Sequence, residues 1–187
     1  YIQCITPLVS LSAIDMAAIL RNPSLAQVQR DYYDAMYRPY MNIVYHNTPE
    51  RHNTATLAEY DCYNRPTRQW LPIAVEMSHL TPTTFKGNAT QFFSEDSKPY
   101  TETLYSTTTW SNDAIRNEPV GVRQAGKDMG SRMQALSSRS NRRSEVRRFS
   151  VTSTGTLRCN GYYPDSTLLV QRVTDEDGKY RTIYTSQ

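Results

Sequence analysis

The sequence is poor in several residue types that usually stabilise a domain of its size. Of its 187 residues, 38% are hydrophobic, seven are glycine and three are cysteine. Three widely spaced cysteines make a poor disulfide framework. No apolar run approaches the roughly 20 residues that a membrane-spanning helix needs, so we expect no such helix.

The common catalytic motifs are also missing. The chain has no phosphate-binding loop, no GxSxG or HExxH pattern and no dinucleotide fingerprint. His46, His52 and His79 do not combine with cysteines at the spacing of a zinc site. We therefore expect a protein that is not an enzyme and holds no metal.

The chain is rich in tyrosine and arginine. It carries 14 tyrosines beside a modest apolar fraction, which supports only a small hydrophobic core. Tyrosine and arginine are enriched where proteins contact each other. This composition predicts a protein whose stability depends on a larger assembly.

The positive charge is concentrated in one segment. Residues 121–159 hold nine basic and two acidic side chains, a net charge of +7, whereas the whole chain carries +3. Such a segment favours an anionic partner, namely nucleic acid, anionic lipid or an acidic protein, although it could also be a solvated polar stretch. The arginines expected to bind the partner are Arg139, Arg142, Arg143, Arg147 and Arg148.

The residue pattern predicts a loop-rich α+β fold with a helical half over residues 1–80. Two apolar stripes at helical spacing indicate helices within residues 10–45, and Pro39 should end or kink the second. The stripes are Leu11, Ile14, Ala18 and Ile19, then Leu25, Val28, Tyr32 and Met36.

The remainder divides into two further predicted parts. Residues 81–120 are rich in Thr, Ser, Asn and Pro with isolated aromatics, which indicates an extended linker segment laid on a surface. Residues 121–187 should form a basic helix around Met129 to Val146, followed by a small antiparallel sheet. Asp177-Gly178 lies between two β-rich runs, which is a hairpin signal.

A short internal similarity links two segments. Tyr33-Asp34 is followed by Arg38-Pro39, and Tyr60-Asp61 is followed by Arg65-Pro66. The similarity is too short to establish a duplication. It does place an aspartate, tyrosines and an arginine around Cys62.

The surroundings of the cysteines suit an open-chain tetrapyrrole attached by a thioether. Such a pigment needs a thiol, an aspartate for its pyrrole N–H groups, an arginine for its propionates and aromatic walls. Near Cys62, Asp61 would bind the pyrrole nitrogens and Arg65 or Arg68 a propionate. Cys159 has Arg158 beside it, whereas Cys4 lies in an apolar context. The alternative for each cysteine is an unmodified buried thiol.

With its basicity, its single spaced cysteines and a first residue other than Met, the chain resembles the gamma subunits of red-algal phycoerythrins. The resemblance implies a chromophore-bearing linker inside an acidic phycobiliprotein α/β hexamer, with phycourobilin or phycoerythrobilin on some or all of Cys4, Cys62 and Cys159. It also implies light harvesting, in the plastid stroma beside the thylakoid. The alternative prediction is a structural component of a nucleoprotein or capsid-type assembly, with the arginines on phosphate.

Overall fold

The computed structural model shows a chain dominated by antiparallel β-structure. It describes residues 1–8, 26–77, 79–94, 103–112, 117–126, 129 and 132–186. Within them lie thirteen strands and one helix, so the predicted α+β fold with N-terminal helices is wrong. The strands are β1 (Ile2–Pro7), β2 (Ala26–Tyr33), β3 (Pro39–Val44), β4 (Asn53–Tyr60), β5 (Pro66–Trp70), β6 (Ile73–Val75), β7 (Tyr105–Trp110), β8 (Pro119–Arg123), β9 (Gln134–Ser140), β10 (Arg147–Val151), β11 (Leu157–Tyr162), β12 (Leu168–Thr174) and β13 (Tyr180–Ser186).

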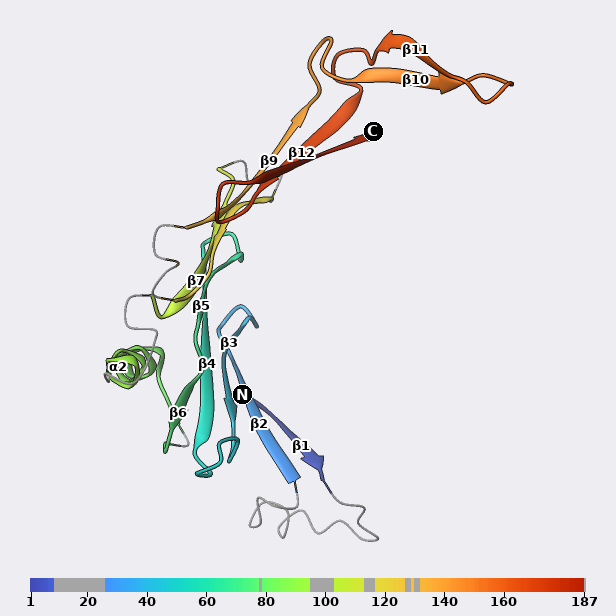
Figure 1. Cartoon of the computed structure of the whole chain (residues 1–187). Coiled ribbons are helices and arrows are strands. Elements are labelled where there is room, and N and C mark those ends of the chain that lie inside the picture. Colours follow the sequence, from blue (N-terminus) through green and yellow to red (C-terminus); the bar gives the residue numbers. More distant parts are fainter. Residues whose placement is uncertain are drawn as a thin grey trace.

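Most strands follow one another through a single sheet. Its order is β1-β2-β3-β4-β5-β7-β8-β9-β12-β13, with β6 paired to β4, and every described pairing is antiparallel. The hairpin β10-β11 forms a separate two-stranded sheet. Figure 1 shows the result as a long ribbon, with β1 near one end and β10-β11 projecting at the other.

The hydrophobic core lies in the N-terminal part of the sheet, where helix α2 (Pro82–Phe93) covers one face (Figure 1). On β4 the alternate residues Asn53, Ala55 and Leu57 are buried, which is the period of a strand with one covered face. From α2, Phe85 is completely buried, and its ring meets Trp70 edge-on with centroids 6.1 Å apart. Thr81 caps the helix by accepting a hydrogen bond from the backbone N–H of Thr84.

The second predicted helix is strand β2. The spacing of Val28 and Tyr32 fits both a helix and a strand, because positions four apart share a face in either. In the structure Tyr32 pairs with Met41 of β3 and faces the core, while Gln29 and Asp31 lie on the other face with Asn42. Strand pairing with distant residues therefore overrides the local pattern. The first predicted helix falls in residues 9–25, outside the described residues.

Two further predictions need correction, and one is confirmed. The middle segment is not extended throughout, since residues 82–93 form helix α2. Residues 134–140 form strand β9 rather than part of a basic helix, in keeping with a Ser-rich stretch that competes poorly for helix. The C-terminal hairpin around Asp177-Gly178 is present as β12 and β13, paired from Leu168 with Ser186 to Thr174 with Tyr180.

In the part of the chain that the structure describes, helix α2 included, no helix has the length and apolar character needed to span a membrane.

Candidate functional site

The hairpin β2-β3 closes through a five-residue turn built on Asp34. The backbone N–H of Asp34 donates to the carbonyl of Arg38 at 3.0 Å, and that of Tyr37 donates to the carbonyl of Asp34 at 3.0 Å. The Asp34 carboxylate Oδ1 accepts from the backbone N–H groups of Met36 (2.8 Å) and Arg38 (3.0 Å). One aspartate thus satisfies two backbone donors that a hairpin loop leaves without strand partners.

The hairpin β4-β5 closes in the same way, 27 residues later, on Asp61. Its Oδ1 accepts from the backbone N–H groups of Tyr63 (2.9 Å) and Arg65 (3.0 Å). The backbone bonds from Asp61 to the Arg65 carbonyl (3.0 Å) and from Asn64 to the Asp61 carbonyl (3.2 Å) complete the match. The short sequence similarity therefore marks a repeated structural unit.

The fourth residue of each turn adopts the left-handed region, at φ 59° for Tyr37 and 66° for Asn64. This is the geometry of a three-residue hairpin loop in which a type I turn is followed by a left-handed residue, and it adds one residue to the strand pairing. The pairing registers shift beside both turns, between Tyr32 and Tyr33 and between Glu59 and Tyr60. The sequence carries no glycine at either position, so the aspartate bonds and the strand pairing hold the turn.

Each turn also contains an ion pair. Oδ2 of Asp34 lies 2.6 Å from Nε of Arg38, and Oδ2 of Asp61 lies 2.7 Å from Nε of Arg65. Hydrogen bonds from Arg38, chiefly from its backbone N–H, lower the pKa of Asp34. Partial burial acts to raise the pKa of Asp61, but the hydrogen bonds from the backbone and side chain of Arg65 outweigh it, and this pKa is also lowered.

The arginine of the first turn reaches the second hairpin. Nη1 of Arg38 donates to the Asp61 carbonyl at 3.3 Å and to Oδ1 of Asn64 at 2.9 Å. Its guanidinium lies 4.8 Å from the centroid of the Tyr60 ring, and the Tyr60 hydroxyl donates to the Pro39 carbonyl at 2.7 Å. We call the contacts among Arg38, Pro39, Tyr60 and Asp61 the first hairpin lock.

The arginine of the second turn makes an equivalent set of contacts to the third hairpin, β7-β8. Nη1 of Arg65 donates to the Ser111 carbonyl at 3.2 Å, and its guanidinium lies 5.4 Å from the Trp110 ring centroid. The indole N–H of Trp110 donates to the Pro66 carbonyl at 2.8 Å. This second hairpin lock, of Arg65, Pro66, Trp110 and Ser111, places Trp110 where the first lock has Tyr60.

Sequence reasoning found the similarity between the two segments that form the first two turns. It placed both segments in the predicted helical half, and it missed Trp110 and Ser111 as part of the same repeat. Tyr60-Asp61 and Trp110-Ser111 share only an aromatic residue followed by a polar one, which is too weak a signal to detect in a chain with many of each. The usable signal was the shared chemistry of Tyr60 and Trp110, since tyrosine and tryptophan each combine an aromatic face with a side-chain hydrogen-bond donor.

Among the described residues, three other turns close with the same backbone pattern but without the arginine. In each, the side-chain oxygen of the first residue accepts from the backbone N–H of the fifth, and the fourth has a positive φ. They are Thr48–His52, Thr152–Thr156 and Asp175–Lys179. The turn chemistry therefore recurs along the chain, while the two locks are specific to the Asp34 and Asp61 turns.

The structure does not bring the three cysteines together. Cys4 lies on β1, Cys62 in the Asp61 turn and Cys159 on β11, and all three are exposed, so the expected alternative of buried thiols is not what the structure shows. Figure 1 places β1 and β11 at opposite ends of the ribbon. Asp61 and Arg65 are next to Cys62 as expected, but they are engaged with each other in the turn.

The other predicted site residues lie in two further places. Arg68 is on β5, 3.8 Å from the carboxylate of Glu59, with its guanidinium 4.9 Å from the Tyr105 ring centroid. Arg139 lies one residue before the end of β9 and forms a bidentate ion pair with Glu145. This ion pair lowers the pKa of Glu145 to about 2, with help from the backbone N–H of Arg142. The remaining predicted arginines are exposed on or beside the hairpin β10-β11: Arg142, Arg143, Arg147, Arg148 and Arg158.

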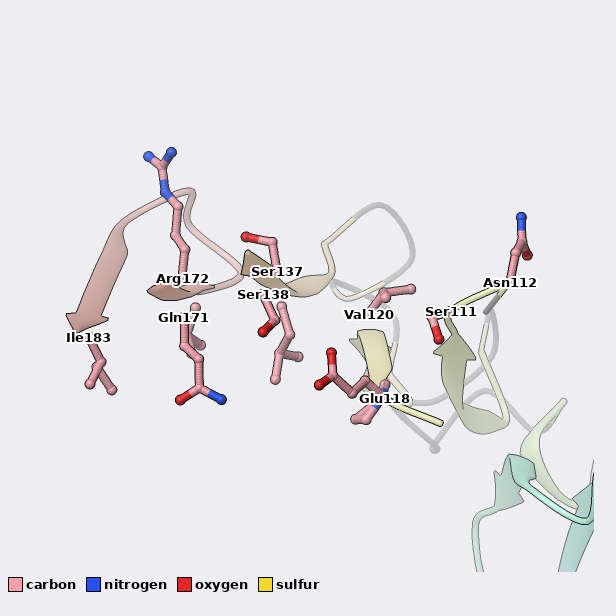
Figure 2. Close-up of a pocket in the computed structure, with 12 residues that line it drawn as sticks. Ser111, Asn112, Glu118, Val120, Ser137, Ser138, Gln171, Arg172 and Ile183 are labelled. Carbon is pink, nitrogen blue, oxygen red and sulfur yellow. The ribbon is translucent and has the colours of Figure 1, made fainter. Parts of the chain in front are cut away.

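A groove of about 560 Å³ lies over β8, β9 and β12. Its described walls are chiefly apolar or weakly polar, and among the described residues that line it Glu118 and Arg172 are the ionisable ones. Figure 2 shows Arg172 and Gln171 pointing to opposite sides of their strand, and Ser137 and Ser138 doing the same. In the same view the side chains of Glu118 and Arg172 do not point toward each other, so these two described residues form no converging acid–base pair. Among the described residues, no group of three His, Cys, Asp or Glu side chains could hold a metal ion.

Comparison with known proteins gives one match. A family model described as a domain of unknown function (DUF6443) matches residues 10–132, which is well over half of the chain and includes both locks. No curated protein and no solved structure matches the chain.

Proposed function

The chain belongs to the DUF6443 family. We propose that it is a non-enzymatic structural module, in which an array of β-hairpins joined by the two hairpin locks serves as a rigid scaffold in a larger assembly. The observation that carries this proposal is the repetition of the lock. Arg38 contacts the second hairpin and Arg65 the third in the same way. In each lock the guanidinium donates to a backbone carbonyl and lies over an aromatic ring, and that aromatic side chain donates to the carbonyl of the proline after the arginine. Repeated contacts between neighbouring units are how quasi-one-dimensional repeat proteins are stabilised.

The distribution of burial supports an assembly role. The principal buried cluster lies under α2, whereas every residue of β10 and β11 and most of β13 are exposed. Large apolar side chains are among them, including Phe149, Leu157 and Ile183. Exposed apolar side chains that gather on one sheet face mark sites of interaction with another molecule.

The pigment-bearing version of this role gains no support from the Asp61 turn. Both carboxylate oxygens of Asp61 already accept hydrogen bonds from the turn, and the Arg65 guanidinium is shared between Asp61 and Ser111. A tetrapyrrole would have to displace these bonds to use either residue. The proposed function therefore rests on the hairpin array alone.

The test follows the full-length chain in extracts of its native cells by size-exclusion chromatography. The scaffold role predicts elution in a complex much larger than the chain, at physiological salt and after nuclease treatment. It further predicts that the paired substitutions Tyr60→Phe and Trp110→Phe, which remove one donor from each lock, reduce incorporation while the purified chain still folds. Elution as a monomer contradicts the proposal, and loss of the complex on nuclease treatment favours the nucleoprotein alternative.

A further inference from the structure

The hairpin β10-β11 is an insertion into a turn of the main sheet. We refer to residues 142–163 as the basic arm. Its base is fixed by Asn141, which is only 1% exposed. Oδ1 of Asn141 accepts from the backbone N–H of Leu168 at 2.7 Å, its Nδ2 donates to the Pro164 carbonyl at 2.8 Å, and its own N–H donates to the Leu168 carbonyl at 2.9 Å. These bonds resemble those of the aspartate turns, with the arm inserted after the first residue.

The basic arm has two chemically different faces. Phe149 pairs with Cys159 and Val151 with Leu157, so these four side chains share one face. Ser150 pairs with Arg158, and Asn160 donates to the Ser150 hydroxyl at 2.7 Å, which places these residues on the other face. Along β10, Arg147 alternates with Phe149 and Val151, so one face is apolar with an arginine at its end, and the other is polar and basic.

The apolar face is open to solvent. Phe149 is 53% exposed, and Val151 and Leu157 are each 69% exposed. A two-stranded hairpin is only marginally stable by itself in water, so covering this face would stabilise the arm. Figure 1 shows the arm projecting from the end of the ribbon, where a partner can approach it.

The charge of the arm selects the chemistry of that partner. Its ionisable side chains at neutral pH are five arginines and Glu145, whose carboxylate is already paired with Arg139 outside the arm. We infer that the basic arm is a docking element for a protein surface with an apolar centre and an acidic rim. Complementary charge would steer the encounter, and burial of the apolar face would hold the complex.

A nucleic acid fits these observations less well. Phosphates would engage the arginines and a base could stack on Phe149, but Val151 and Leu157 offer no stacking surface and would stay exposed. An acidic protein surface with apolar side chains satisfies both kinds of group. The inference goes beyond the scaffold role and rests on it only in assuming that the chain acts in an assembly.

The experiment titrates the purified full-length chain against three labelled probes by fluorescence anisotropy. The first is a 12-residue peptide of alternating glutamate and leucine, the second is polyglutamate of the same length, and the third is a single-stranded DNA oligonucleotide. We expect the glutamate-leucine peptide to bind most tightly of the three probes. The paired substitutions Val151→Ser and Leu157→Ser should weaken the binding of this peptide at least about tenfold. The same change at an exposed apolar residue far from the arm, Met36→Ser, should leave binding unchanged.

Each other outcome overturns the inference. DNA bound more tightly than the glutamate-leucine peptide assigns the arm to nucleic acid. Self-association of the chain that the Val151→Ser, Leu157→Ser pair abolishes assigns the apolar face to a second copy. Equal binding by the arm variant and the wild type, when both show the same thermal unfolding, removes the arm as the docking element. None of these results bears on the native complex that tests the scaffold role.

Discussion

Replacing Tyr60 tests whether the hairpin locks stabilise the array. Tyr60→Phe removes only the hydroxyl, which donates to the Pro39 carbonyl at 2.7 Å, and keeps the ring beneath the Arg38 guanidinium. Tyr60→Leu removes the ring as well. The two variants therefore separate the hydrogen bond from the cation–π contact.

The expected magnitudes follow from these contacts. Loss of a hydrogen bond of this kind lowers the free energy of unfolding by about 1 kcal/mol. The ring contact adds about 0.5–1 kcal/mol, measured as the coupling energy between Tyr60→Leu and Arg38→Met in a double-mutant cycle. The cycle subtracts the loss of the ion pair between Arg38 and Asp34, because both Arg38 variants share that loss.

The assay is equilibrium unfolding in urea, followed by the fluorescence of Trp70 and Trp110. Hydrogen exchange gives a local readout, since the amides of Asp61 and Asn64 close the second turn and should exchange faster in Tyr60→Phe. Tyr37→Phe is the matched control, because Tyr37 is 88% exposed. If Tyr60→Phe and Tyr37→Phe both match the wild type within about 0.3 kcal/mol and the cycle is additive, the lock contributes nothing and the reasoning is refuted.

Three further predictions concern the core, acid stability and Cys62. Phe85→Ala should lower the free energy of unfolding by about 3–5 kcal/mol in the same urea assay, because the ring is fully buried between α2 and the sheet; a loss below about 1 kcal/mol would contradict this packing. The pKa of Glu145 is lowered from 4.5 to about 2, so its contribution to the free energy of unfolding is complete above pH 4.5 and is lost as the pH falls towards 2. Glu145→Gln should therefore reduce the loss of stability between these pH values, and an unchanged pH profile of stability would count against the ion pair. The bilin hypothesis predicts added mass on the Cys62 peptide from native protein, and an unmodified thiol there removes it.

The sequence by itself determined those features whose chemistry lies within a few consecutive residues. The Asp177-Gly178 hairpin was predicted correctly, because its turn needs only a side-chain acceptor and a glycine at φ 80°. The similarity between the Asp34 and Asp61 turns was also visible, since each aspartate, arginine and proline lies within six residues. Sequence alone further indicated a modest core and a basic segment.

Only the tertiary structure decided which segments are strands and how the hairpins join. Val28 and Tyr32 fit a helix and a strand equally well, and the pairing of Tyr32 with Met41 settles the choice. Trp110 acquires its role only when Arg65 and Pro66, more than forty residues earlier, are brought beside it. Strand pairing and contacts between hairpins depend on distant partners, so a local residue pattern does not contain them.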